Sequence, residues 1–226
     1  MSLPSTIAID GPAASGKSTI AKRLADYLDY LYFDTGVMYR AITWVALERI
    51  GAVADEAAVV NLAETVQIDV RAASQNDGRD CDVLADGEDI TWGIRLPDVD
   101  ANVSVVAAYP GVREALTSQQ RRIGQRGKVV MVGRDIGTVV LPDADLKIYL
   151  DASMQERARR RFDERVARGD EISFDAVLAA MRKRDEIDST RKVAPLRAAD
   201  DAVILNSDGL DIDQVLERAK SMAGDC

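Results

Sequence analysis

The chain has 226 residues, of which 47% are hydrophobic, and this fits one α/β domain with an insertion, or one large and one small domain. Its net charge of −9 argues against a nucleic-acid or membrane surface. No apolar run reaches the roughly 18 residues of a membrane span, and no signal peptide is recognisable, so we expect a cytoplasmic protein. Histidine is absent, which excludes histidine bases and histidine-ligated metals, and Cys81 and Cys226 predict free thiols.

A glycine-rich phosphate-binding pattern follows the first predicted strand. A β-branched strand at 6–9 leads into residues 11–18, which read G-x-x-x-x-G-K-S, and an amphipathic helix is expected over 17–28. Backbone N–H groups of such a loop and of the helix start can surround a phosphate. Lys17 can reach the β- and γ-phosphates, and the Ser18 hydroxyl can ligate Mg²⁺. The alternative is an ordinary glycine-rich turn between a strand and a helix. The motif and its strand–loop–helix context together favour the phosphate-binding loop.

A second strand and two helices are expected next. The strand at 30–33 ends in Asp34-Thr35-Gly36, and a helix over 37–50 closes at Gly51. Arg40 lies in the first turns of this helix, where its charge opposes the helix dipole. It therefore needs an anionic partner, which is either a bound phosphate or a nearby acidic side chain. A further helix is predicted over 55–66.

The pattern then changes to short strands in which apolar and polar residues alternate. These are expected at 67–73, 80–85 and 88–91, with Asp86-Gly87 as a hairpin signal. We therefore predict a small antiparallel sheet, inserted at about 65–96 in a βαβ chain.

The second half returns to alternating helices and strands. Helices are predicted over 97–108, which carries Ser104 near its end, and 110–126, which carries Arg113. The β-branched strand at 128–132 reads as buried on both faces and delivers Gly133-Arg134-Asp135 at its carboxyl end. Ligands bind at that edge in open α/β sheets. The remaining elements are strands at 146–150 and 202–205 and a closing helix over 212–222.

Two charged helices lie between these last strands. Ser153-x-x-Glu156 is a capping box that begins a helix rich in arginine. Its arginines are Arg157, Arg159, Arg160, Arg161, Arg165 and Arg168. They form either a solvated face, with Glu156–Arg160 and Glu164–Arg168 pairs, or a cationic surface for a triphosphate. In the helix over 174–191, one face continues from apolar residues into Arg184, Asp188 and Arg191, so these three are expected to point to the interior or a cleft.

The alternation predicts an α/β fold of the P-loop NTPase type, with a doubly wound, five-stranded parallel sheet flanked by helices. Three functional classes compete: a small-molecule phosphotransferase, a switch or motor NTPase, and a nucleotide-binding module without chemistry. The guanine motif N-K-x-D and the transporter signature S-G-G-Q are absent. Arginines at the ends of elements favour a second phosphorylated substrate and hence a phosphotransferase.

Four motifs together resemble the bacterial cytidylate kinases. They are G-P-A-A-S-G-K-S-T at 11–19, F-D-T-G-V-M-Y-R at 33–40, G-R-D-I-G-T-V-V at 133–140, and K-R-D-x-x-D-S-x-R at 183–191 followed by V-A-P-L. Their order and spacing match along nearly the whole chain. The resemblance implies transfer of the γ-phosphoryl group of ATP to CMP or dCMP, with Mg²⁺ as cofactor. It implies no nucleic-acid or membrane partner, and we expect a monomer.

The resemblance also implies roles for single residues. The ATP phosphates would be held by Gly11, Pro12, Ala13, Ala14, Ser15, Gly16, Lys17, Ser18 and Thr19. The CMP phosphate would be held by Thr35, Arg40, Arg134 and Arg191, the cytosine by Ser104, Arg113 and Asp135, and the sugar by Arg184 and Asp188. Lys17, Arg134 and Arg160 would be catalytic, and Ser18 would bind the metal. The core would comprise 1–34, 107–153 and 170–226, the monophosphate-binding region 35–106, and a short lid 154–169.

The cytosine assignment has a chemical basis of its own. A carboxylate such as Asp135 accepts a hydrogen bond from the 4-amino group of cytosine, and a cationic donor suits its O2 or N3 atom. Uracil would present an oxygen to the carboxylate instead, so we expect discrimination against UMP. A uridylate or adenylate kinase is the alternative enzyme, and a regulatory NTP-binding protein is the alternative from another class.

Overall fold

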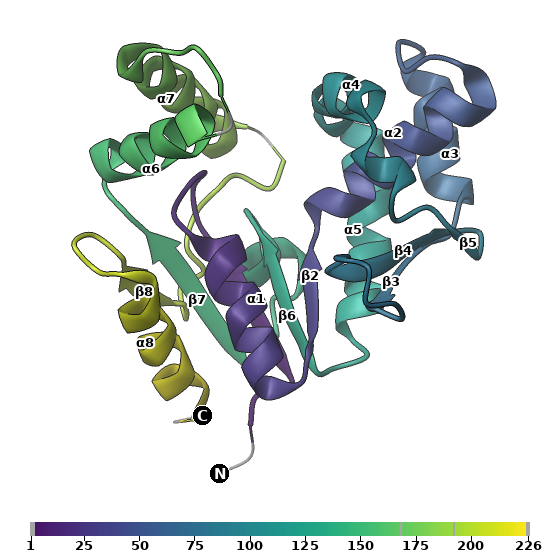
Figure 1. Ribbon diagram of the computed structural model, residues 1–226. Coiled ribbons are helices and arrows are strands. Elements are labelled where there is room, and N and C mark those ends of the chain that lie inside the picture. Colours follow the sequence, from purple (N-terminus) through teal and green to yellow (C-terminus); the bar gives the residue numbers. More distant parts are fainter. Residues whose placement is uncertain (1–2, 168, 192, 225–226) are drawn as a thin grey trace.

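The computed structural model describes residues 3–167, 169–191 and 193–224, so Arg168 and Cys226 lie outside the described residues. A five-stranded parallel sheet forms its centre (Figure 1). The strands are β1 Thr6–Asp10, β2 Leu31–Asp34, β6 Val129–Gly133, β7 Leu146–Asp151 and β8 Val203–Asn206, in the spatial order β2-β6-β1-β7-β8. The doubly wound parallel sheet predicted from the sequence is confirmed.

Each helix predicted from the sequence is present. The helices are α1 Lys17–Leu28, α2 Gly36–Ile50, α3 Glu56–Thr65, α4 Pro97–Ala108, α5 Pro110–Gly124, α6 Met154–Ala167, α7 Phe174–Thr190 and α8 Ile212–Gly224. Local chemistry sets several ends: Gly51 closes α2 at a φ of 72°, and the Asp55 side chain accepts from the Ala58 N–H at the start of α3. Ser153 likewise accepts from the Glu156 N–H at the start of α6. In the described part of the chain, no helix combines the length and the apolar character needed to cross a membrane.

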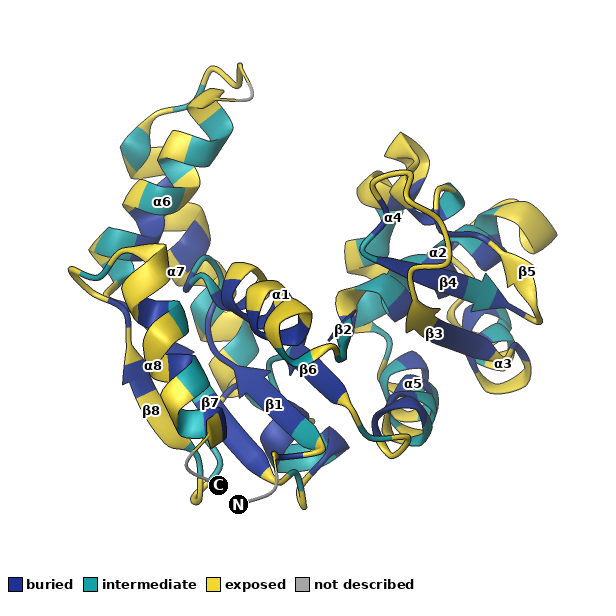
Figure 2. Ribbon diagram, turned by 60° about the horizontal axis from the view of Figure 1, so that its bottom comes forward, coloured by how far each residue is buried: buried dark blue, intermediate teal, exposed yellow. Residues whose placement is uncertain are grey.

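Strand β6 has apolar side chains on both of its faces. Val130 and Val132 belong to the apolar cluster that packs against α1 and α8. Val129 and Met131 belong to the larger cluster that packs against α2 and α5. Figure 2 shows β1, β6 and β7 mostly buried, whereas the edge strand β8 is largely exposed. This burial on both faces explains why the run consists almost entirely of apolar, mostly β-branched residues.

The predicted antiparallel sheet is present as β3 Ile68–Ala72, β4 Cys81–Ala85 and β5 Glu88–Asp89. Asp86 and Gly87 have φ angles of 50° and 89°, as a tight hairpin turn requires. Arg79, whose side chain is only 3% exposed, forms ion pairs with Asp77, Asp82 and Asp89 and so connects the loop before β4 to β5. In Figure 1 this sheet lies with α2, α3, α4 and α5 on the side of β2, whereas α6 and α7 lie on the other side of the molecule.

Two short helical turns have no counterpart in the sequence predictions, and the first is the 3-10 turn η1 Gly93–Arg95. A π-helical turn, η2 Ile136–Val140, follows Asp135, and it includes hydrogen bonds from the Val140 and Leu141 amides to the carbonyls of Asp135 and Ile136. The Arg121 guanidinium of α5 donates to the carbonyls of Val139 and Val140, at 2.7 and 3.0 Å, and so completes the end of the turn. Arg121 therefore joins the end of this turn to α5.

Candidate functional site

The loop between β1 and α1 has a backbone that only glycine supports at two positions. Gly11 has a φ of +152°, and a Cβ atom there would lie 2.1 Å from the carbonyl oxygen of Leu150. Gly16 has a φ of +92° and directly precedes the helix. The Ser15 Oγ is buried and has no hydrogen-bond partner among the described residues. This geometry leaves loop and helix N–H groups available for an anion.

Lys17 and Ser18 lie at the start of α1, beside the end of β2. The Lys17 ammonium donates to the Pro12 carbonyl at 2.9 Å across the loop, and the residue is buried. Burial, together with repulsion from Arg134, lowers the pKa of Lys17 to about 7. The Ser18 hydroxyl donates to the Asp34 carboxylate at 3.3 Å. Hydroxyl and carboxylate oxygens are ligands that Mg²⁺ accepts, so this pair can hold a metal ion.

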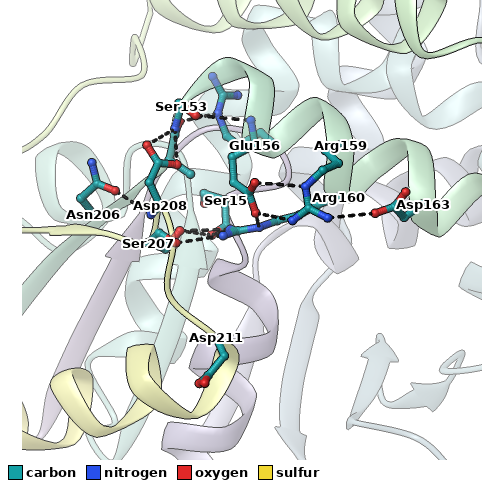
Figure 3. Close-up of polar contacts among 12 residues, drawn as sticks. Ser15, Ser153, Glu156, Arg159, Arg160, Asp163, Asn206, Ser207, Asp208 and Asp211 are labelled. Carbon is teal, nitrogen blue, oxygen red and sulfur yellow. Dashed lines mark hydrogen bonds and ion pairs between the residues drawn. The ribbon is translucent and has the colours of Figure 1, made fainter.

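Arg160 of α6 reaches the same loop from the other side. Figure 3 shows its guanidinium between Glu156, one turn earlier, and Ser207 after β8. It donates to the Ser15 carbonyl at 3.3 Å and to the Ser207 carbonyl at 2.9 Å. The predicted Glu156–Arg160 pair is thus present, with Nε 2.9 Å from the carboxylate. Arg160 therefore contacts the backbone of the phosphate loop.

A cluster of opposite charges lies at the carboxyl edge of the sheet, which we call the guanidinium–carboxylate cluster. Its members are Arg113, Arg134, Asp135, Arg184, Asp188 and Arg191. Asp135 lies 3.7 Å from Arg113 and 3.6 Å from Arg191. Asp188 accepts from Arg134 at 3.0 Å and lies 3.7 Å from Arg191. Residues from α5, the end of β6 and the end of α7 thus meet, as the strand-end argument predicts.

Asp135 is the most enclosed carboxylate of this cluster, with a side chain that is 14% exposed. Burial raises its pKa above the ordinary value, although Arg113 and Arg191 act in the opposite direction. The Arg113 Nε and Arg191 Nη2 atoms are buried and have no hydrogen-bond partner among the described residues. Arg113 also stands over the Tyr39 ring, 5.6 Å from its centre. Buried donors without partners mark this as a place where a polar ligand fits.

Three of the residues predicted to bind the monophosphate substrate lie outside this cluster. The buried Thr35 donates its hydroxyl to the Val132 carbonyl at 3.0 Å, next to Gly133. Arg40 points away, to the Asp100 carboxylate at 2.5 Å and the Ile94 carbonyl at 3.1 Å. It thus has the acidic partner that the sequence left as one alternative, and it lines a cavity of about 330 Å³ together with Cys81. Ser104 is exposed on α4.

The three charged residues predicted to share one face of α7 are enclosed to different degrees. Asp188 and Arg191 are enclosed, with side chains 15% and 19% exposed, but Arg184 is 62% exposed and lies 4.0 Å from Asp188. Arg184 therefore lies at the solvent-exposed side of the cluster, one helical turn before Asp188, and burial together with repulsion from Arg134 lowers its pKa.

Three residues to which the sequence assigned no role of their own also lie at or beside the phosphate loop. Arg157 is buried, and it donates to the Ala13 carbonyl of the loop at 3.2 Å and to Asp185 of α7 at 2.6 Å. Asp34 pairs with Ser18, and its position at a strand end was the available signal. Asp10 is buried at the end of β1.

Comparisons with known proteins agree with this arrangement. The family model described as cytidylate kinase matches residues 7–224. A cytidylate kinase of Herpetosiphon aurantiacus is 52% identical over 224 residues, covering 99% of this chain and 96% of that protein. One of Chloroflexus aggregans is 52% identical over 210 residues, covering 93% and 90% of the two chains.

Among solved structures, a gluconokinase from Sinorhizobium meliloti has a TM-score of 0.50 at 12% identity, covering 100% of this chain and 94% of that one. At this identity the likeness shows the fold alone. The family model matches nearly the whole chain, and the two cytidylate kinases are about half identical to it, so this protein belongs to the cytidylate kinase family.

Proposed function

We propose that this chain transfers the γ-phosphoryl group of ATP to CMP or dCMP and releases ADP and CDP or dCDP. One observation carries the proposal: the phosphate loop and the guanidinium–carboxylate cluster lie at the same edge of the sheet. Asp10, which leads into the loop, pairs in register with Gly133, which leads into Arg134 and Asp135. Two phosphorylated substrates bound at these two places would meet end to end, as direct transfer requires.

The loop suits the triphosphate. Residues Gly11 to Thr19 would hold its phosphates, and the Lys17 ammonium would exchange the Pro12 carbonyl for phosphate oxygens. An anion beside Lys17 would favour its charged form and so oppose the effect of burial on its pKa. Arg160 is already anchored against Ser15 and Ser207, and from there it can contribute charge to the transferring group.

The cluster suits a cytidine monophosphate. Asp135 would accept from the 4-amino group of the base, with Arg113 as the donor to O2 or N3 and Ser104 as a third residue that contacts the base. The phosphate would be held by Thr35, Arg40, Arg134 and Arg191, and the sugar by Arg184 and Asp188. Arg40 would have to exchange Asp100 for the phosphate, and this exchange is inexpensive because both side chains of the pair are partly exposed.

The residues beside the loop fit a magnesium ion. Ser18 supplies a hydroxyl oxygen and Asp34 a carboxylate oxygen, 3.3 Å apart, and Mg²⁺ takes oxygen ligands of this kind. When bound with ATP, the ion would neutralise phosphate charge. The chain itself aligns the two substrates and adds the charges of Lys17, Arg134 and Arg160. No general base is needed, because the attacking CMP oxygen is already an anion at neutral pH.

All proposed site residues come from one chain, which a monomer can supply, and we assign the reaction to the cytoplasm. The region 35–106 would bind the monophosphate, and 154–169 would act as a lid that excludes water during transfer.

The test is a coupled assay of ADP release with CMP, dCMP, UMP and AMP. We expect CMP and dCMP to be the best substrates; AMP as the best substrate would overturn the proposal. ATP binding without acceleration by any monophosphate would instead support a regulatory protein. Lys17→Ala should cut turnover severely without unfolding. Asp135→Ala should lose selectivity for CMP while ATP binding persists, whereas a collapse of ATP affinity with selectivity retained would contradict the role of Asp135.

A further inference from the structure

Asp10 occupies an unusual place, as a buried acid at the last position of β1, directly before the phosphate loop. Both of its carboxylate oxygens accept hydrogen bonds from backbone amides. Oδ1 accepts from the Ile136 N–H at 2.8 Å, and Oδ2 accepts from the Gly137 N–H at 2.7 Å. None of the roles proposed above involves this side chain.

The two amides begin the π-helical turn η2, and they follow Asp135 directly in the chain. Asp135 itself has a φ of −146° and a ψ of 24°, outside the regular helix and strand regions. Its carboxylate is contacted by Arg113 and Arg191 at 3.7 and 3.6 Å, which are ion-pair rather than hydrogen-bond distances. The orientation of Asp135 therefore depends heavily on the backbone that Asp10 holds.

Close packing leaves this turn little freedom to shift. A Cβ atom added at Gly137 would lie 3.4 Å from the Asp10 Oδ2 and 3.2 Å from the Lys147 side chain. A carboxylate that receives two N–H groups is a strong, charge-assisted anchor. An asparagine in its place would turn an NH₂ group toward one of the amides and leave that buried donor without an acceptor.

We infer that Asp10 is a positioning residue for base selection, which fixes the turn after Asp135 and so aims the Asp135 carboxylate at the base of the monophosphate. The inference rests on the proposed function. It predicts a role that concerns the second substrate, although Asp10 adjoins the loop for the first. Burial also raises the pKa of Asp10, to about 6, which agrees with an anchor enclosed by protein rather than by water.

The experiment compares Asp10→Asn, Asp10→Ala and wild type in steady-state kinetics with CMP and UMP. The ratio of kcat/KM for CMP to that for UMP should fall about tenfold in Asp10→Asn, since one charge-assisted bond is lost, and further in Asp10→Ala. The KM for CMP should rise while the KM for ATP stays within about twofold, a split that general loss of structure does not produce.

The chain offers a matched control at the opposite end of β1. Asp145 also accepts from two successive backbone amides, those of Ser5 and Thr6, at 2.8 and 2.9 Å. Asp145→Asn should leave the CMP to UMP ratio unchanged. Gly137→Ala disturbs the same turn from the other side and should lower the ratio in the same direction, so it provides the test if Asp10→Asn fails to fold.

Two results would overturn the inference: an unchanged ratio in Asp10→Asn or in a folded Gly137→Ala, or a raised KM for ATP with selectivity retained, which would assign Asp10 to the phosphate loop. Failure of the proposed function is distinguishable, because wild type would then not prefer CMP in the first place.

Discussion

Arg157 provides the sharpest test of how the two halves of the site are joined. Its guanidinium donates to the Ala152 carbonyl at 2.9 Å, to Ala13 of the phosphate loop and to Asp185 of α7. The same helix carries Arg161, which pairs with Glu164 at 2.8 Å on the surface. Replacing each by alanine compares a buried connection with an exposed one on a common background.

The magnitude follows from burial. The Arg157 side chain is 6% exposed and that of Asp185 is 21% exposed, and the Asp185 Oδ1 already has no hydrogen-bond partner among the described residues. Arg157→Ala leaves this carboxylate without its cation, which costs about 3–5 kcal/mol in a buried pair. For a chain of this size each kcal/mol lowers the Tm by roughly 2–4 °C. We therefore expect a Tm at least about 6 °C lower.

Denaturant unfolding and thermal scans measure this cost for Arg157→Ala, Asp185→Ala and the double variant. The double variant should cost less than the two single variants combined, since no unpaired charge remains. The control Arg161→Ala should cost about 0–1 kcal/mol, as exposed pairs do. Two results would refute a stabilising buried ion pair between Arg157 and Asp185: an unfolding free energy of Arg157→Ala within about 1 kcal/mol of that of wild type, or a double variant whose loss equals the sum of the losses of the two single variants.

Three further predictions concern backbone, thiol and salt bridge. Gly11→Ala should destabilise the fold by more than about 3 kcal/mol and abolish nucleotide binding, because the added Cβ would overlap the Leu150 carbonyl. Gly51→Ala should cost only about 1–2 kcal/mol, because Gly51 has a φ of +72° but no atom within 4 Å of the added Cβ. Equal unfolding free energies of the two variants would contradict this. Burial raises the pKa of Cys81 to about 12, so iodoacetamide at pH 8 should label it slowly in the native protein, and rapid labelling seen by peptide mass spectrometry would speak against it. Asp100→Ala should lower the KM for CMP by at most about fivefold, since the side chains of the Arg40–Asp100 pair are partly exposed, and a tenfold increase would show that the pair assists binding instead.

Much of the fold was accessible from the sequence because the main elements carry strong periodic signals. The β-branched run at 128–132 predicted a strand buried on both faces, and the Asp86-Gly87 pair predicted the hairpin of the small sheet. The phosphate loop was recognisable because strand, glycines and helix occur together. Position at a strand end was sufficient to single out Arg134 and Asp135, since parallel strands deliver their carboxyl ends to one edge.

The partners of charged side chains were much less predictable. Arg157 and Arg161 are indistinguishable in a run of arginines, and only the tertiary fold brings Ala13 and Asp185 to one of them. For Arg40, the sequence left a phosphate and an acid as equal alternatives, and its partner Asp100 comes from α4, in a distant part of the chain. The turn η2 depends on a carboxylate from β1, so no local pattern announces it.

The guanidinium–carboxylate cluster has a consequence for closure of the site. Its four guanidinium groups against two carboxylates leave a surplus of two positive charges. This surplus matches the dianionic phosphate of the CMP proposed to bind there, so the cluster with bound CMP is close to neutral. Closing the site therefore removes little net charge from contact with water. The γ-phosphoryl group takes to the monophosphate side the negative charge that the triphosphate side loses, so transfer leaves the total charge of the site unchanged. The electrostatic balance that allows the site to close is therefore set when the two substrates bind, and the chemical step does not disturb it.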